Sequence, residues 1–140
     1  MLDVMQQTLC DMQGRLFLLS AKENYSSEAF IKTFMLSQSA ADLDMVFHHM
    51  QWAGQGYLFD RLKEENAATL TQGGTIYDDE TLYWIGYLYR YWHYYTAESS
   101  KAIYKQAPAN VMCSMYLMYH TMSPEMAIDR LKDAYRRKKT

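Results

Sequence analysis

The stretch YWIGYLYRYWHYYTAESSKAIY, from Tyr83 to Tyr104, decides how this 140-residue chain folds. Up to Tyr95 it contains six tyrosines, two tryptophans, one arginine and one histidine. Asp78 or Asp79, just before it, is positioned to cap a helix. The stretch therefore predicts a helix that is aromatic on nearly every side. Such a helix usually lies at the centre of a fold, with neighbours around it.

On a helical projection, the aromatic helix carries two neighbouring stripes. An apolar stripe contains Trp84, Leu88, Tyr91, Trp92 and Tyr95, and a second stripe contains Tyr83, Tyr87, Arg90 and Tyr94. Buried tyrosine hydroxyls need hydrogen-bond partners, so the thirteen tyrosines of this chain indicate that some reach the surface. Two interpretations stay open. One is an aromatic core in which a carboxylate satisfies Arg90. The other is a binding surface, because Tyr, Trp and Arg are enriched at binding hot spots.

The rest of the chain also shows helical periodicity. A stripe of Leu2, Met5, Leu9, Met12, Leu16 and Leu19 predicts a helix to about Lys22, which faces the core or pairs with another chain. Further helices are expected near residues 28–37, 43–66, 101–106 and 110–122 and from Pro124 onward, with a loop at 67–78. Gly54 and Gly56 predict a kink or a close helix contact. The expected fold is all-α, a single domain over residues 1–140, with six or seven helices around the central aromatic helix.

The composition restricts the classes of protein. Apolar residues make up 49% of the chain and charged residues 21%, as in ordinary globular proteins. No stretch approaches the roughly 18 uncharged apolar residues of a membrane span, so no membrane partner is expected. Cys10 and Cys113 are far apart, and no signal peptide precedes them. They predict reduced thiols and a cytoplasmic location.

Charge is distributed unevenly along the chain. Residues 1–128 carry 14 acidic and eight basic side chains, whereas residues 129–140 carry six basic and two acidic ones. The acidic body makes a nucleic-acid partner unlikely, except through the basic end from Arg136 to Lys139. Such an end can also be a solvated helix terminus whose cations complement the helix dipole. A nucleic-acid-binding regulator is thus a third hypothesis.

Arg90 and His93 raise the question of catalysis. Helical ribonucleases of the HEPN class use an arginine and a histidine that lie farther apart along the chain than this pair, so the pair does not match that motif. Gly86 falls on the same line of the helix and allows close approach of another backbone or of a ligand. The alternative prediction is therefore a helical ribonuclease or a ligand-binding protein with a pocket near Arg90 and His93, to which Tyr104 contributes.

Metal and cofactor chemistry have little support in the sequence. Asp44 and His48 have the i, i+4 spacing of a metal-binding pair, but no second pair at matching spacing completes a site. His120 has no potential metal ligand at a matching spacing. No nucleophile with a matching base is recognisable from spacing. We expect no metal, no cofactor and no catalytic residues.

Two strings are distinctive, YWIGYLYRYWHYYTAESSKAIYKQAP from Tyr83 to Pro108 and HTMSPEMAIDRL from His120 to Leu131. They resemble a poorly characterised group of small helical bacterial proteins associated with toxin–antitoxin-type loci. The resemblance implies an antitoxin-like or accessory role and assigns no catalytic residue. The favoured prediction is a non-enzymatic protein-interaction module, an antitoxin that binds and neutralises a partner toxin enzyme. The expected partner contacts are Tyr87, Arg90, Tyr91, His93, Tyr94, Ser99, Ser100, Lys101 and Tyr104.

Overall fold

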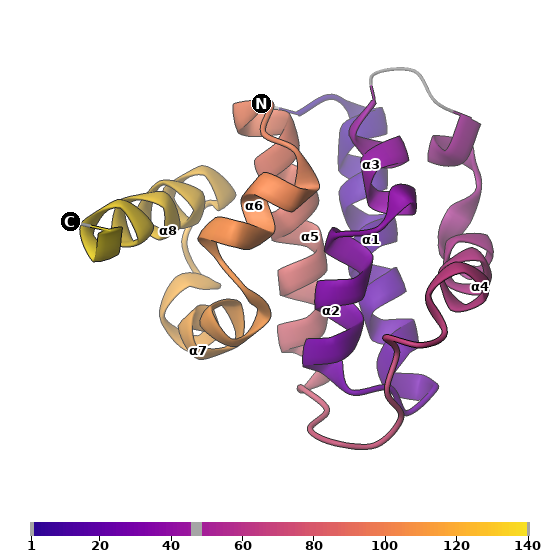
Figure 1. The fold of residues 1–140 in the computed structure, drawn as a ribbon. Coiled ribbons are helices and arrows are strands. Elements are labelled where there is room, and N and C mark those ends of the chain that lie inside the picture. The colour runs from indigo at the N-terminus through magenta and orange to yellow at the C-terminus, as the bar shows by residue number, and fades with distance from the viewer. Residues whose placement is uncertain (1, 46–48, 140) are drawn as a thin grey trace.

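The computed structural model describes residues 2–45 and 49–139, which form an all-α fold (Figure 1). The all-α class predicted from periodicity is confirmed. Within the described residues there are eight α-helices and one 3₁₀ turn, one helix more than the upper expectation of seven. They are α1 (Val4–Lys22), α2 (Ser27–Met35), α3 (Gln38–Asp44), η1 (His49–Trp52), α4 (Gly54–Asn66), α5 (Asp79–Thr96), α6 (Ser100–Gln106), α7 (Ala109–Tyr119) and α8 (Pro124–Lys139).

The aromatic helix α5 lies at the centre of the fold, as predicted. Figure 1 shows it beside α1, with α2, α3 and α4 towards one side and α6, α7 and α8 towards the other. Helix α5 packs against α1, α6, α7 and α8. Ile85, Leu88, Tyr89 and Trp92 are buried in these contacts. The neighbours of α5 thus explain why its sequence is aromatic on most sides.

Two glycines let α1 and α5 touch backbone to backbone. A Cβ atom on Gly86 would lie 2.6 Å from the carbonyl oxygen of Gln13 and 2.9 Å from Cα of Gly14. In addition, Gln13 Nε2 donates a hydrogen bond to the Gly86 carbonyl oxygen at 2.9 Å. The close approach expected at Gly86 is therefore to another backbone, that of α1. This crossing holds the two longest helices of the core in contact.

Helix α1 faces the core, which was one of its two predicted roles. Of the predicted stripe, Leu9, Met12 and Leu16 are buried, whereas Leu2, Met5 and Leu19 are partly buried. The buried face also includes Cys10, Gln13, Gly14, Phe17 and Ser20. It is wider than the predicted stripe because α5, α4 and α2 all pack against α1.

The single helix expected over residues 43–66 is wrong. Helix α3 ends at Asp44, and Met45 has extended backbone. Helix α4 begins only at Gly54, whose φ of 80° lies in the left-handed region that glycine adopts without strain. The predicted kink at this glycine is thus a helix boundary. Two predictions fall on residues outside the described part of the chain. They are the place of Val46 on the helix face and the metal-binding pair of Asp44 with His48.

The loop predicted at residues 67–78 lies against the turn between α1 and α2. The amide of Ser26 donates to the Thr71 carbonyl oxygen at 2.7 Å, and the amide of Gly73 donates to the Asn24 carbonyl oxygen at 2.8 Å. These bonds satisfy backbone groups outside helices. The loop is therefore fixed to the turn between α1 and α2.

Helix α8 begins as predicted, after the Ser123–Pro124 pair. Ser123 Oγ accepts a hydrogen bond from the Met126 amide at 3.2 Å and so caps the helix. Its last turn is basic, and Arg136 and Arg137 both pair with Asp133 within α8. Among the described helices, α8 included, none combines the length and the apolar content that crossing a membrane requires.

Candidate functional site

Arg90 lies in a buried polar cluster, where its side chain is only 1% exposed. Its Nε donates to Gln13 Oε1 of α1 at 2.9 Å, and Nη1 donates to Asp44 Oδ1, at the end of α3, at 2.7 Å. Its Nη2 donates to Ser100 Oγ, at the start of α6, at 3.2 Å. One guanidinium on α5 therefore links three other helices. Of the two interpretations left open by the sequence, this arrangement matches the buried core in which a carboxylate pairs with Arg90.

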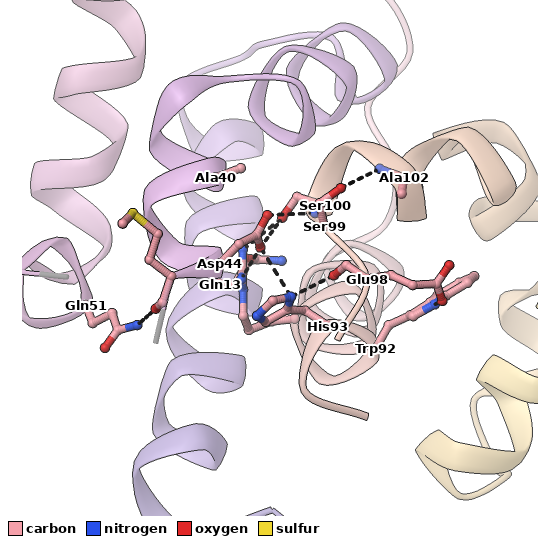
Figure 2. Close-up of polar contacts among 12 residues, drawn as sticks. Gln13, Ala40, Asp44, Gln51, Trp92, His93, Glu98, Ser99, Ser100 and Ala102 are labelled. Carbon is pink, nitrogen blue, oxygen red and sulfur yellow. Dashed lines mark hydrogen bonds and ion pairs between the residues drawn. The ribbon is translucent and has the colours of Figure 1, made fainter. Parts of the chain in front are cut away.

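Asp44 is the acceptor on which this cluster converges (Figure 2). Besides the bond from Arg90, it accepts bonds from the Ser100 amide and the Ser100 hydroxyl, each at 2.7 Å. The carboxylate is 12% exposed. A buried charge is tolerated when it is paired and hydrogen-bonded, as this one is.

His93 is held by the chain that follows α5. Its Nδ1 lies 2.7 Å from the Glu98 carbonyl oxygen and 3.7 Å from Asp44 Oδ1 (Figure 2). A carbonyl oxygen only accepts, so Nδ1 carries a proton. Arg90 and His93 are therefore both held by contacts with the chain around the start of α6 and the end of α3.

Glu98 forms a second polar cluster next to the first. Its Oε1 accepts from Trp92 Nε1 at 3.0 Å and from Lys132 Nζ of α8 at 2.5 Å, and its Oε2 accepts from Gln106 Nε2 at 2.5 Å. Burial alone raises the pKa of Glu98, but the hydrogen bonds from Lys132, Trp92 and Gln106 outweigh burial and lower the pKa to about 2. The ionised carboxylate thus ties α8 to α5 and α6.

Because hydrogen bonds stabilise the ionised form of Glu98, we expect the free energy of unfolding to fall at acidic pH. Because its folded pKa of about 2 lies below the ordinary value of 4.5, its contribution to stability is complete above pH 4.5 and is lost as the pH falls towards 2. Chemical denaturation at a series of pH values should show Glu98→Gln much less stable than wild type at neutral pH, with the gap closing below pH 4.5. The exposed Glu64→Gln is the control. A gap that stays constant with pH would contradict the prediction.

The nine predicted partner contacts do not form one surface. Arg90, Tyr91 and Ser100 are buried, Tyr87, His93, Tyr94 and Tyr104 are partly buried, and Ser99 and Lys101 are exposed. The buried three are corrected to internal positions. Arg90 and Ser100 bond within the Asp44 cluster, and the Tyr91 hydroxyl donates to Glu125 of α8. The remaining six stay predicted contacts.

Ser99, Tyr94 and Tyr104, three of these six, have the following surroundings inside the fold. Ser99 Oγ accepts from the Ala102 amide at 3.1 Å and caps α6 (Figure 2). The hydroxyl of Tyr94 is buried with no hydrogen-bond partner among the described residues. The ring of Tyr104 packs against that of Tyr89, with centroids 6.4 Å apart.

Neither cysteine is activated as a nucleophile. Burial raises the pKa of Cys10 to about 12, against the opposing effect of Arg90, and burial also raises the pKa of the partly buried Cys113. Both thiols are free and stay protonated at neutral pH, the unreactive form. Among the described residues, no three His, Cys, Asp or Glu side chains gather closely enough to hold a metal ion.

A groove of about 580 Å³ runs along α5 on its exposed side. We call it the aromatic groove, since four aromatic rings, Tyr83, Trp84, Tyr87 and Tyr116, form much of its wall. The other lining residues are Leu18, Asp79, Glu80, Leu88, His120, Met122 and Pro124. They come from α1, α5, α7 and the segment leading into α8. Its volume is in the range of pockets that bind small molecules or anchor side chains.

The rings of the aromatic groove meet at steep and shallow angles. Trp84 and Tyr116 are nearly perpendicular, with centroids 5.7 Å apart. Tyr116 is stacked on His120 at 4.3 Å, and Tyr83 is tilted against Tyr87 at 5.9 Å. The rings that line the groove are therefore held in place by contacts with one another.

The sequence contained a signal for part of this groove. Glu80, Tyr83, Trp84 and Tyr87 are spaced i, i+3, i+4 and i+7, which places them on one face of a helix. The helical projection assigned Tyr83 and Trp84 to different stripes, so their shared face was not recognised as a binding surface. Tyr116 lies on α7, and no local pattern shows that α7 packs beside this face of α5.

The chain has no match among models of protein families, among curated proteins or among solved structures. Its function is inferred from the surfaces and polar clusters of the fold.

Proposed function

We propose that this chain is a protein-interaction module that holds its partner at the aromatic groove. In its most specific form, it is an antitoxin that binds and neutralises a toxin enzyme. The observation that carries the proposal is the groove itself, a hollow of about 580 Å³ walled by tyrosine and tryptophan on the central helix.

The residue types of the groove suit a protein partner. Tyrosine and tryptophan supply large contact areas with few rotatable bonds, and they dominate the hot spots of interfaces. Tyr83, Trp84 and Tyr87 are partly buried, so each keeps free surface while its neighbours hold it in place. Rigid side chains lose little entropy on binding. Of the contacts predicted from sequence, Tyr87 is the one that lines this groove.

The hydrogen bonds of Arg90 and His93, the two residues considered for catalysis, also favour a binding role. Arg90 has three hydrogen bonds inside the fold, and His93 Nδ1 is bonded to a backbone carbonyl oxygen. Both side chains are thus held by contacts within the fold. The antitoxin proposal is supported by the resemblance of the strings at Tyr83–Pro108 and His120–Leu131 to proteins of toxin–antitoxin-type loci. These two strings contain most of the residues that line the groove.

Alanine substitutions in the groove are expected to weaken partner binding strongly. Trp84→Ala and Tyr87→Ala each remove an aromatic wall, and a hot-spot aromatic typically contributes about 2 kcal/mol or more, roughly 30-fold in affinity. The measurement is co-purification with the product of the adjacent gene, followed by calorimetry of the purified pair. Circular dichroism establishes that each variant is folded.

The matched control is Tyr57→Ala. Tyr57 is 57% exposed on α4 and does not line the groove, so its loss should leave binding unchanged. If folded Trp84→Ala and Tyr87→Ala bind the partner as tightly as Tyr57→Ala does, the aromatic groove is not the contact surface. Neutralisation is tested by the activity of the partner enzyme with and without this chain.

A further inference from the structure

We propose that the aromatic groove receives an arginine side chain of the partner. This inference rests on the proposed function, because it names the chemistry that the partner presents to the same groove. It is carried by two features of the lining, electron-rich ring faces and an unbalanced negative charge.

The ring faces come first. A cation over the face of Trp or Tyr is attracted by the quadrupole of the ring. Trp84 and Tyr116 both line the groove and pack against each other nearly perpendicularly, with ring centroids 5.7 Å apart. The Tyr83 hydroxyl donates to Asp11 Oδ1 at 2.5 Å, and the Tyr116 hydroxyl donates to Glu80 Oε2 at 3.3 Å. Donation to a carboxylate makes a phenol ring richer in electrons and strengthens its attraction for a cation.

The charge of the lining is negative. Asp79 and Glu80 are exposed in the first turn of α5, and none of the eleven lining residues is a lysine or an arginine. Asp11, next to the groove, is paired with Arg15 at 2.8 Å and adds little net charge. Both first-turn acids also complement the dipole of α5, but the bond from Tyr116 holds the Glu80 carboxylate against an aromatic wall of the groove.

Arginine satisfies both features at once. Its guanidinium is planar, so it stacks on an aromatic face, and its N–H groups match the two oxygens of a carboxylate. Glu80 next to Tyr116 and Trp84 offers that combination. The lysine ammonium is a compact, strongly hydrated charge that neither stacks nor binds a carboxylate through two parallel bonds.

The first experiment uses a capped pentapeptide with arginine at its centre and glycine elsewhere. Its matched control carries citrulline, which has the same shape without the charge. The chain has three tryptophans, and their indole N–H signals report binding in an NMR titration. The Trp84 signal, assigned from a Trp84→Phe variant, should shift with the arginine peptide. The signals of Trp52, which is 75% exposed and does not line the groove, and of buried Trp92 should not.

We expect the citrulline peptide to bind at least roughly tenfold more weakly, since it loses a cation–π contact and a charge-assisted hydrogen bond. Glu80→Gln should weaken the arginine peptide by a similar factor and leave the citrulline peptide unaffected. Glu64→Gln removes an exposed acid that does not line the groove and should change neither. Equal binding of the two peptides, or an unmoved Trp84 signal, would overturn the inference, as would a lysine peptide that binds as tightly as the arginine peptide.

The same variants separate this inference from the proposed function. A partner whose binding is lost in Trp84→Ala and unchanged in Glu80→Gln would support the interaction groove and overturn arginine recognition. An arginine peptide that binds at Trp84, together with a partner insensitive to Trp84→Ala, would support the cation site and overturn the groove as the partner's contact surface.

Discussion

Asp44→Ala is expected to lower the free energy of unfolding by about 3–5 kcal/mol, the cost of leaving a buried charge unpaired. Arg90 is 1% exposed and pairs with Asp44 at 2.7 Å, so the guanidinium would lose its counter-ion without gaining water. The amide and hydroxyl of Ser100 would lose their acceptor as well. Urea denaturation followed by circular dichroism measures the loss.

A double-mutant cycle identifies the cause. Arg90→Met removes the charge that Asp44→Ala leaves unpaired, so the double variant should be distinctly more stable than the sum of the two single losses predicts. Asp60→Ala is the control, because Asp60 is 73% exposed and lies 3.5 Å from its partner Lys63. Exposed pairs of this kind contribute about 0–1 kcal/mol. If Asp44→Ala cost no more than Asp60→Ala, the cluster would not be an anchor of the fold.

Gly86→Ala is the second substitution with a large expected effect, a loss of about 1–3 kcal/mol or more, as overpacking of a core typically causes. The added Cβ would lie 2.6 Å from Gln13 O and 2.9 Å from Gly14 Cα. Both are backbone atoms, so no rotamer change relieves the clash. Helices α1 and α5 would have to move apart, and the Gln13 Nε2 bond to the Gly86 carbonyl oxygen would stretch.

Gly56→Ala makes the same chemical change with the opposite expected sign. Gly56 lies in α4, and a Cβ atom added there would meet no described atom within 4 Å beyond the backbone of its own helix and its chain neighbours. Alanine there should stabilise the chain by up to about 1 kcal/mol through helix propensity alone. Thermal denaturation of the two variants side by side is the measurement. A Gly86→Ala protein as stable as Gly56→Ala would mean that the α1–α5 contact is not tight.

Much of the fold was predictable because its signals are local. Helix α5 was expected from the density of aromatic residues, and α8 from the Ser123–Pro124 start. The predicted capping aspartate is less decisive, since Asp78 is the N-cap residue of α5 but its side chain makes no capping hydrogen bond among the described residues. The loop at 67–78 was expected from its lack of periodicity. Helix α4 shows the limit of such reasoning, since the pattern over residues 43–66 continued across Gly54. The structure ends α3 at Asp44, and α4 begins at Gly54, whose backbone is left-handed.

The candidate site was predictable only in part. Tyr87 was expected to contact a partner and does line the aromatic groove, whereas Arg90 and Ser100, expected beside it, are buried around Asp44. A sequence shows which residues share a helix face, but it does not show which neighbouring helix covers that face. Arg90 was therefore compatible both with a core and with a surface.

By itself, the sequence determined that this chain is all-α, that its most aromatic helix is central and that Ser123 with Pro124 starts the last helix. These properties follow from spacing along the chain, because helix period and capping act within a few residues. The tertiary structure alone decided that Asp44 neutralises Arg90 across 46 residues, that Gly86 meets Gly14, and that Tyr116 completes the groove begun by Tyr83, Trp84 and Tyr87. These contacts join separate helices, and the packing of their side chains, which no local pattern encodes, brings them together.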